Sequence, residues 1–526
     1  MSALSPTQSD HQFEELCEFL EAPTSYPHPV EKVKVIHTHG AVVFLAGDQA
    51  YKIKRPVKYA YLDFSTLEKR RHICERELEL NQPSAPEIYL GLTKITREED
   101  GSFALEGNGK TVEWAVHMRR FETEHILDNY ARAGKLDREL AADLASRIAD
   151  YHNSQTPIDV SDGAARIKEI IQQIETVFKT LTPHLPNGLP ATFVAKALEA
   201  HEKHAAALDS RASEGMIRHC HGDLHLQNIV LINGTPTLFD ALEFDDRLAT
   251  IDCLYDLAFL LMDLNYRGLR DAANTVISRY ALEAWPLIKN EGFSLLPLFM
   301  ALRAAIRAMV AAEAAEQNPD MQEAKEQEAA TYLKKALRQF NNAPPRLYAI
   351  GGLSGTGKST LSAALSPTLE GNVGAIRLRS DVTRKVLFGI EEFAPSPDWA
   401  YTPENIQKVY DLLEEKATTI LQQGQSVLLD AVFSRPHERE AARKLAEGLN
   451  TPFTGLWLEA PADCLYQRVN DRKRDASDAD GTVVEKQLNR VAEADSSLIE
   501  GWIAIDASGS PEQTLENAKA ALKTKQ

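Results

Sequence analysis

The chain has 526 residues, a net charge of −18, and 44% hydrophobic and 25% charged residues, values typical of about three compact globular units. The negative charge argues against a nucleic-acid partner, because phosphates require a positive surface. Apolar runs fall far short of the roughly 18 residues that span a membrane, and the N-terminus lacks the basic start and apolar core of a signal peptide. The five cysteines form no CxxC pair, which predicts a reduced, cytoplasmic protein without a membrane partner.

Three short strands are predicted after an amphipathic helix near the N-terminus, and they cover residues 33–37, 41–45 and 50–54. Lys52 and Lys54 share one face of the third strand, because alternate residues of a strand point the same way. Ala50 stands two positions before Lys52, as in the V-A-I-K pattern, which favours Lys52 over Lys54 for contact with nucleotide phosphates. A solvated basic strand is the alternative interpretation.

A helix is predicted over residues 65–81, because the segment opens with the pattern of a capping box. It has the place and length to supply an acidic partner for the strand lysine. Glu77 is our choice for this partner, with Glu75 and Glu79 as alternatives; several acids in one helix also fit a solvated face.

Two further strands and a long helical region follow. The strands are predicted at 85–94 and 111–121, and helices at 136–153, 164–180 and 190–208. We therefore expect a strand-rich part over residues 1–122 and a helical part over residues 123–340.

Residues 221–246 read HGDLHLQNIVLINGTPTLFDALEFDD. The Asn233-Gly234 pair between apolar runs predicts a hairpin, because both turn residues need positive φ. The hairpin would place Asn228 beside Asp240 and bring both to Asp223. Two oxygen ligands for Mg²⁺ and one carboxylate base are what phosphoryl transfer from ATP requires.

This stretch resembles the catalytic loop of the aminoglycoside phosphotransferase family, which reads H-x-D-x-x-x-x-N. The resemblance implies a bilobal, protein-kinase-like α+β domain, with Asp223 as the base for the substrate hydroxyl and Asn228 and Asp240 as Mg²⁺ ligands. In that fold Lys52 and Glu77 would bind the nucleotide.

Two other positions refine this resemblance. Gly222 stands where protein kinases carry the Arg that pairs with a phosphorylated activation loop, which favours a small-molecule kinase. Asp256 resembles the acid that ties the catalytic loop in place, so we expect it to support the loop rather than to react.

A second nucleotide site is predicted after a linker over residues 341–345. A strand over 346–350 leads into GGLSGTGKST, which fits G-x-x-x-x-G-K-[ST]. Such a loop turns its backbone amides inward around phosphates, while its Lys reaches the terminal phosphates and its Ser coordinates Mg²⁺. The predicted nucleotide-binding residues are Gly352, Leu353, Ser354, Gly355, Thr356, Gly357, Lys358, Ser359 and Thr360, with Ser359 also a metal ligand.

Asp430 ends an apolar strand over 426–430 and resembles a Walker B acid that orients the Mg²⁺ shell. Ala431 follows it, not the Glu that positions water in hydrolytic motors. The Ala at this position favours a kinase rather than a hydrolytic motor. Together with the P-loop pattern, the strands predict an α/β P-loop domain with a parallel sheet, covering residues 346–526.

The segment after a third strand, IRLRSDVTR, resembles the acceptor-binding segment of small P-loop kinases such as polynucleotide kinase, gluconate kinase and zeta toxin. The resemblance implies Asp381 as a proton acceptor and Arg384 as an anion contact; helix capping by Ser380 or Asp381 is the alternative. Arg435 is a further substrate-contact candidate.

Residues 465–478 contain several arginines, and in related kinases a lid brings arginines onto the transferring phosphate. Arg472 is our choice for a catalytic role, with a basic helix face as the alternative.

Together these features predict a bifunctional, ATP- and Mg²⁺-dependent kinase that phosphorylates hydroxyl groups of small molecules at two sites. Two alternatives stay open: the P-loop unit is a nucleotide switch for the first kinase, or one unit is degenerate and the chain is a scaffold or toxin-neutralising protein. Neither the acceptors nor the oligomeric state can be read from the sequence.

Overall fold

The computed structural model describes residues 8–38, 40–58, 63–341, 343–471, 475–493 and 500–524. By internal packing the chain forms two compact units. Unit 1 comprises residues 1–136, 154–158 and 217–256, and unit 2 comprises 137–153, 159–216 and 257–526. The predicted domain boundaries at 122, 340 and 346 follow a different division and stay predictions.

Unit 1 is built on an antiparallel sheet with the strand order β1-β2-β3-β6-β4-β5. Its strands are β1 (Val33–His37), β2 (Ala41–Ala46), β3 (Gln49–Lys54), β4 (Tyr89–Arg97), β5 (Phe103–Leu105) and β6 (Lys110–Arg119). The three strands predicted near the N-terminus are confirmed, and β5 was not predicted.

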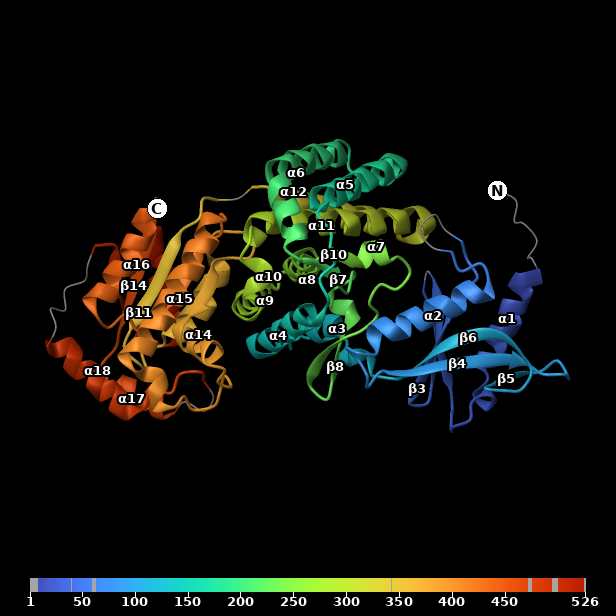
Figure 1. Cartoon of the computed structure of the whole chain (residues 1–526), viewed down its shortest axis with the longest axis horizontal. Coiled ribbons are helices and arrows are strands. Elements are labelled where there is room, and N and C mark those ends of the chain that lie inside the picture. Colours follow the sequence, from blue (N-terminus) through green and yellow to red (C-terminus); the bar gives the residue numbers. More distant parts are fainter. Residues whose placement is uncertain are drawn as a thin grey trace. The chain divides into compact units, whose positions relative to one another are not determined.

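Helices cover both faces of this sheet (Figure 1). α1 (Gln8–Glu21) buries Leu16 and Leu20 against one face. α2 (Leu67–Asn81) packs Cys74 against the opposite face, next to Ala50 of β3. Because strand residues alternate, Lys52 and Lys54 point to the same face as Ala50, toward α2. The N-cap of α2 is Thr66, whose side chain accepts from the amide of Lys69 at 3.3 Å, rather than Ser65 of the predicted capping box.

The rest of unit 1 carries the HGD loop and the hairpin that follows it. Its elements are α3 (Leu127–Arg132), β7 (Ile217–His219), β8 (Ile229–Ile232), β9 (Thr235–Leu238), α7 (Asp246–Ala249) and β10 (Thr250–Asp252). β8 and β9 pair antiparallel across Asn233-Gly234, whose φ values of 51° and 81° both lie in the left-handed region. The amide of Phe239 donates to Asn228 O at 3.1 Å, so the predicted hairpin register is confirmed.

Unit 2 begins with a helical part. Its helices are α4 (Arg138–Ser154), α5 (Gly163–Thr180), α6 (Leu189–Ser213), α9 (Arg270–Glu283), α10 (Trp285–Ile288), α11 (Gly292–Gln317) and α12 (Gln322–Arg338); α8 (Cys253–Tyr266) starts in unit 1 and continues here. By length and composition α11 could cross a membrane, contrary to the estimate from apolar runs. However, 78% of its most apolar stretch is buried inside the protein, as in a core helix.

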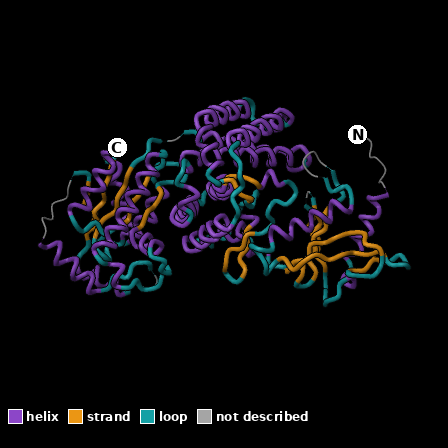
Figure 2. The backbone as a smooth tube through the Cα atoms, in the orientation of Figure 1, coloured by secondary structure: helices purple, strands orange, loops and turns teal. Residues whose placement is uncertain are grey.

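The remainder of unit 2 is a parallel sheet with the strand order β12-β13-β11-β14-β15, whose strands and surrounding helices are distinguished by colour in Figure 2. Its elements are β11 (Leu347–Gly352), α13 (Lys358–Leu365), β12 (Ile376–Arg379), α14 (Ser380–Leu387), α15 (Pro403–Gln422), β13 (Val427–Asp430), α16 (Pro436–Gly448), β14 (Phe453–Glu459), α17 (Ala462–Asn470), α18 (Gly481–Glu493), β15 (Trp502–Asp506) and α19 (Pro511–Lys523). The predicted fold class, an α+β region followed by an α/β region with a parallel sheet, is confirmed.

Within unit 2, α9 packs on the part of the chain that leads into β12. The amide of Asn274 donates to Val373 O and Ala375 O, both at 2.8 Å, and its oxygen accepts from the Ser366 hydroxyl at 2.8 Å. Asn274 is buried, so these three bonds satisfy polar groups that water cannot reach.

Replacing Asn274 with Ala should therefore lower the free energy of unfolding of unit 2 by about 3 kcal/mol, because buried acceptors and a hydroxyl lose their partner. Urea unfolding followed by tryptophan fluorescence measures this, since Trp285, Trp399, Trp457 and Trp502 lie in unit 2. The control is Asn187→Ala at an exposed loop position, which should change the value by less than about 0.5 kcal/mol. Equal effects of both substitutions would contradict the prediction.

Candidate functional sites

A network of ion pairs centred on the buried Glu77 and Lys54 joins α2, β3 and the segment after β9 in unit 1. Lys52 Nζ lies 2.9 Å from Glu77 Oε1 and 2.6 Å from Asp240 Oδ1. Lys54 Nζ lies 2.6 Å from Glu77 Oε2 and 2.6 Å from Glu243 Oε1. Each oxygen of Glu77 thus accepts from one of the two lysines, and α2, β3 and the segment after β9 are held together by charge.

The charges in this network keep one another ionised. Burial alone would raise the pKa of Glu77, but Lys52 and Lys54 outweigh it and hold the pKa at about 2. Burial disfavours the charge of Lys52, but Asp240 and Glu77 raise its pKa well above its usual value. Because Lys52 bridges the helix acid and Asp240, the predicted pairing of Lys52 with Glu77, rather than with Glu75 or Glu79, agrees with this geometry.

The HGD loop brings Asp223 and Asn228 together. Asn228 Nδ2 donates to Asp223 Oδ2 at 2.8 Å and to Asp223 O at 3.0 Å. His225 Nδ1 accepts from the amide of Gln227 at 3.3 Å, so its proton resides on Nε2, which lies 3.3 Å from Asp223 Oδ2. Two donors therefore orient the carboxylate of Asp223, whose side chain is 41% exposed and open to a substrate.

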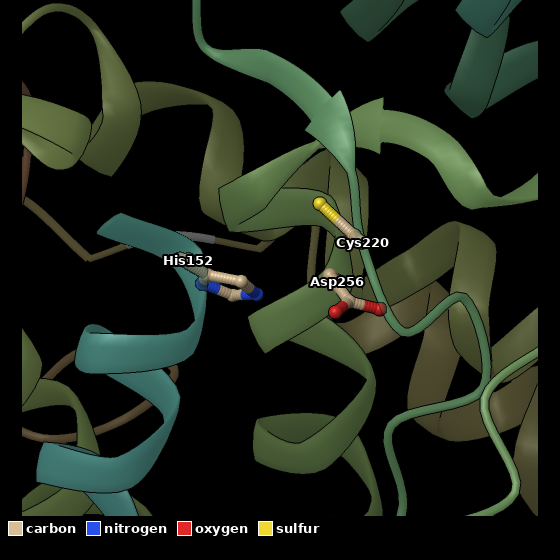
Figure 3. A group of neighbouring side chains, drawn as sticks. All are labelled: His152, Cys220 and Asp256. Carbon is tan, nitrogen blue, oxygen red and sulfur yellow. The ribbon is translucent and has the colours of Figure 1, made fainter. Parts of the chain in front are cut away.

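Asp256, in the first turn of α8, forms hydrogen bonds with the backbone at the start of the HGD loop. Its carboxylate accepts from the amide of His221 at 3.1 Å and from that of Gly222 at 2.9 Å. Figure 3 shows Asp256 with its carboxylate toward the loop that continues from Cys220. The side chain acts on the backbone of the loop, as the sequence led us to expect of a supporting residue.

Asp240 is held in a left-handed backbone conformation with φ of 60°, which residues other than glycine rarely adopt. The Tyr89 hydroxyl accepts from the amide of Asp240 at 3.1 Å, and Asn81 Oδ1 accepts from the amide of Ala241 at 2.8 Å. Such conformations persist where the surroundings enforce them, and they concentrate at functional sites. Here the turn directs the Asp240 carboxylate to Lys52.

Sequence reasoning missed four residues of this site. Lys54 was considered only as a rival to Lys52, whereas both bind Glu77. Glu243, Tyr89 and Asn81 were not considered as site residues. The spacing of Lys52 and Lys54 on one strand face was a signal for a shared partner, but nothing in the sequence pairs Lys54 with a residue 189 positions away.

The P-loop between β11 and α13 is shaped by its glycines. Gly352, Gly355 and Gly357 have φ values of 140°, 86° and 90°. A Cβ on Gly355 would lie 2.6 Å from Leu465 O, and one on Gly352 would lie 2.8 Å from Leu458 O. The loop therefore needs glycine for both conformation and space. Lys358 Nζ donates to Leu353 O at 2.9 Å, across the curve of the loop.

The register of the parallel sheet places the carboxyl ends of β11, β12 and β13 side by side. Asp430 pairs with Ile350 in β11 and with Arg379 in β12, so it stands beside the segments that lead into the P-loop and into Asp381. Its carboxylate accepts from the Ser362 hydroxyl at 2.7 Å. Parallel strands gather the residues at their carboxyl ends at one edge, where ligands bind in such folds.

A cavity of about 1000 Å³ opens at this edge. It is lined by the P-loop from Ser354 to Thr360 and by all the predicted acceptor residues that the structure describes, Asp381, Arg384 and Arg435. Arg472 lies outside the described residues.

Asp381 and Arg384 form an ion pair inside this cavity, with Arg384 Nη1 2.8 Å from Asp381 Oδ1. The Arg384 guanidinium also lies 4.5 Å from the ring of Tyr401. The N-cap position of α14 is Arg379, and no side-chain capping bond forms there. The capping alternative for Ser380 and Asp381 thus finds no support, and their side chains face the cavity instead.

The residues present fit ATP and Mg²⁺ at both places by the chemistry of their donors. In unit 2 the P-loop precedes Lys358 and Ser359 and lines a large cavity, and side chains at Gly352 or Gly355 would clash with the neighbouring backbone. In unit 1, Lys52 pairs with the Asp240 carboxylate, and Asn228 lies opposite Phe239, the residue before Asp240, and donates to Asp223. Oxygen ligands with a neighbouring cation are the set that a Mg²⁺-bound triphosphate requires.

Comparison with protein families separates the two sites. Residues 71–289 match the phosphotransferase enzyme family, and residues 347–494 match the AAA domain family. The chain thus joins a segment that matches the phosphotransferase enzyme family to a segment that matches the AAA domain family. This confirms the family resemblance predicted for each half of the sequence.

Three known proteins illustrate the similarity. An uncharacterized protein of Mycobacterium tuberculosis is 29% identical over 503 residues, which cover 93% of this chain and 96% of that protein. The structure of the GDP complex of aminoglycoside 2'-phosphotransferase-IIIa is similar over 62% of this chain and 97% of its own, with 14% identity and a TM-score of 0.37. A gluconokinase from Sinorhizobium meliloti is similar over 34% of this chain and 93% of its own, with 18% identity and a TM-score of 0.26.

The Glu77 network should make the stability of unit 1 depend on pH. Its folded pKa of about 2 lies below the ordinary 4.5, so the contribution to stability is complete above about pH 4.5 and is lost as pH falls toward 2. The Glu77→Gln variant should cost about 3–5 kcal/mol at pH 7, and this deficit should shrink between pH 5 and pH 3.

Urea unfolding at several pH values, followed in peptides of α2 and β3 by pulsed hydrogen exchange, measures this difference. Glu79→Gln on the same helix is the control, because Glu79 is exposed and pairs with Arg76 at the surface; it should cost less than about 1 kcal/mol. A Glu77→Gln deficit that stays constant with pH would show that Glu77 is not held ionised by the lysines.

Proposed function

We propose that the protein is a cytoplasmic, bifunctional, ATP- and Mg²⁺-dependent kinase that phosphorylates hydroxyl groups of small molecules at two sites, one in each unit. The observation that carries this proposal is that each unit contains a lysine and an aspartate of the types that kinases use to contact phosphates and to accept the acceptor's proton. Lys52 and Asp223 serve unit 1, and Lys358 and Asp381 serve unit 2. The free cysteines agree with a reducing compartment.

In unit 1, Asp223 takes the proton of the acceptor hydroxyl as its oxygen attacks the terminal phosphorus. Asn228 and His225 orient the carboxylate for this transfer, which is a general-base role. Lys52, held in place by Glu77, stabilises negative charge on the phosphate oxygens. Asn228 and Asp240 would hold Mg²⁺, which supplies further charge neutralisation when it is bound.

In unit 2, the P-loop amides and Lys358 bind the phosphates, with Ser359 and Asp430 as the metal-binding pair. Asp381 takes the acceptor proton, and Arg384 holds its carboxylate in the cavity until an acceptor arrives. Arg435 and Arg384 are the substrate contacts, and Arg472 completes the charge stabilisation during transfer.

A second candidate function is favoured by the packing of α9 within unit 2. Through Asn274 and Arg270, α9 binds the backbone between α13 and β12. These hydrogen bonds connect the P-loop domain to the helical part within unit 2. Nucleotide bound at the P-loop could therefore change the conformation of the helical part and act as a switch.

Single-site variants distinguish these functions. A screen of the purified protein against hydroxyl-bearing metabolites, with ATP consumption as the readout, should yield two classes of acceptor. Asp223→Asn should lower kcat for one class by about 10²–10⁴ because the general base is lost. Lys358→Ala should lower kcat for the other class by a factor on the order of 10² or more. Loss of both classes in Lys358→Ala would favour the switch, and loss of neither in either variant would overturn the proposal.

The two strand lysines should also separate in kinetics and stability. Lys52→Met should reduce kcat/KM for ATP in unit 1 by about 10²-fold, because Lys52 is the lysine that reaches Asp240 and the phosphates. Lys54→Met should mainly destabilise unit 1, by about 3–5 kcal/mol, because it leaves Glu243 and Glu77 undercompensated in a buried place. Steady-state kinetics and urea unfolding measure the two effects, and a reversed pattern would assign the phosphate contact to Lys54.

A further inference from the structure

A second, smaller cavity of about 240 Å³ lies in unit 2 and belongs to neither nucleotide site. It is lined by the start of α4, by α9 and by β12 with the start of α14. Four guanidinium groups from these three elements line it, those of Arg138, Arg279, Arg377 and Arg379. So many cations around one small cavity require either carboxylate partners or an anion.

The strand geometry explains two of the four. Arg377 and Arg379 alternate along β12 with the buried Ile376 and Leu378, so both point to the face of the sheet opposite these apolar residues. β12 is the edge strand of its sheet, and α9 covers its open side: the Arg377 amide donates to the Ser278 hydroxyl at 3.0 Å.

Three of the four arginines are neutralised by acids. Arg138 Nε lies 2.9 Å from Asp271 Oδ1, and Arg279 pairs with Glu283 at 3.3 Å and more closely with Glu392. Arg379 pairs with Asp475 and lies 4.0 Å from Asp430.

Arg377 differs from these three. Within the described parts of the chain, its guanidinium has no hydrogen-bond acceptor and no carboxylate at ion-pair distance. Burial lowers its pKa to about 10; Asp430 opposes this effect, and the neighbouring arginines add to it. The cavity thus holds a half-buried cation that, within the described residues, has no carboxylate at ion-pair distance.

Acidic residues also line the cavity, but within the described residues they form no ion pair with Arg377. Glu392 is already paired with Arg279. Glu139 and Asp143 on α4 have interactions of their own, and neither forms an ion pair with Arg377. The balance at the inner wall, where β12 runs, is therefore positive.

We propose that this cavity binds an oxyanion, phosphate or the phosphoryl group of a small metabolite, through Arg377 with Arg379, Arg138 and Arg279 around it. A guanidinium fork matches two oxygens of such an anion. Arg379 also contacts Asp430 and Asp475 beside the nucleotide cavity, and β12 runs directly into Asp381. Binding would therefore link the occupancy of this cavity to the acceptor side of the P-loop site.

The test is calorimetric titration of the full-length protein with inorganic phosphate, in the presence of Mg²⁺ and a saturating non-hydrolysable ATP analogue that fills both nucleotide sites. We expect one remaining site per chain and at least tenfold weaker binding in Arg377→Gln. The matched control is Arg443→Gln on α16, whose guanidinium pairs with Glu440 at 2.7 Å at the surface; its affinity should equal that of the wild type. Circular dichroism verifies that each variant is folded.

A second variant keeps every arginine. Leu282→Glu adds a carboxylate to the cavity lining and should weaken phosphate binding by repulsion, also at least tenfold. Displacement by glycerol phosphate distinguishes the sources: tighter binding than phosphate indicates a phosphorylated metabolite, and equal binding indicates free phosphate. Absence of phosphate binding to the nucleotide-saturated protein, or unchanged affinity in both Arg377→Gln and Leu282→Glu, would overturn the proposal.

Discussion

The face of the unit 1 sheet that packs against α2 depends on one buried carboxylate shared by two lysines. Glu77 accepts from Lys52 and Lys54, and each lysine is paired again beyond β9, with Asp240 and Glu243. Removing any member would leave an uncompensated charge in a buried place, which costs several kcal/mol. The network therefore sets the distance between strand, helix and the Asp240 turn, and it fixes the position of Lys52, the residue that the proposed function assigns to the phosphates. The same four ion pairs therefore hold these elements together and determine where the charged side chains of this face lie.

Features that are encoded locally could be read from the sequence. The hairpin at Asn233-Gly234 follows from two residues that tolerate positive φ, and its register placed Asn228 opposite Phe239. The P-loop was readable for the same reason, because Gly352, Gly355 and Gly357 determine its path without help from distant residues. In both cases a short segment contains the whole physical cause of its conformation.

Features that depend on distant packing could not be read. Lys54 looked like an alternative to Lys52 because the sequence does not reveal that one carboxylate accepts from both. Tyr89 supports the turn at Asp240 from a strand 151 positions earlier, and no local pattern indicates this. The docking of Asn274 on Val373 and Ala375 likewise depends on two segments about a hundred residues apart. Residue types such as Asn and Tyr carry no signal of these roles until the fold brings their partners within reach.

The edge of the parallel sheet connects the P-loop chemistry to the helical part of unit 2. An exposed edge strand has unpaired amides and must be covered, and α9 covers β12 through Ser278 and Asn274. β12 ends at Arg379, and Asp381 lies in the first turn of α14, which begins at Ser380. The same strand thus has a covered edge on one side and leads to a catalytic candidate at its end. Under the proposed function, a shift of Asp381 toward an acceptor must either bend the chain at Ser380 or strain the bonds between β12 and α9. A hinge at Ser380 would leave α9 in place, whereas movement of β12 as a whole would displace α9 and would support the proposed nucleotide switch.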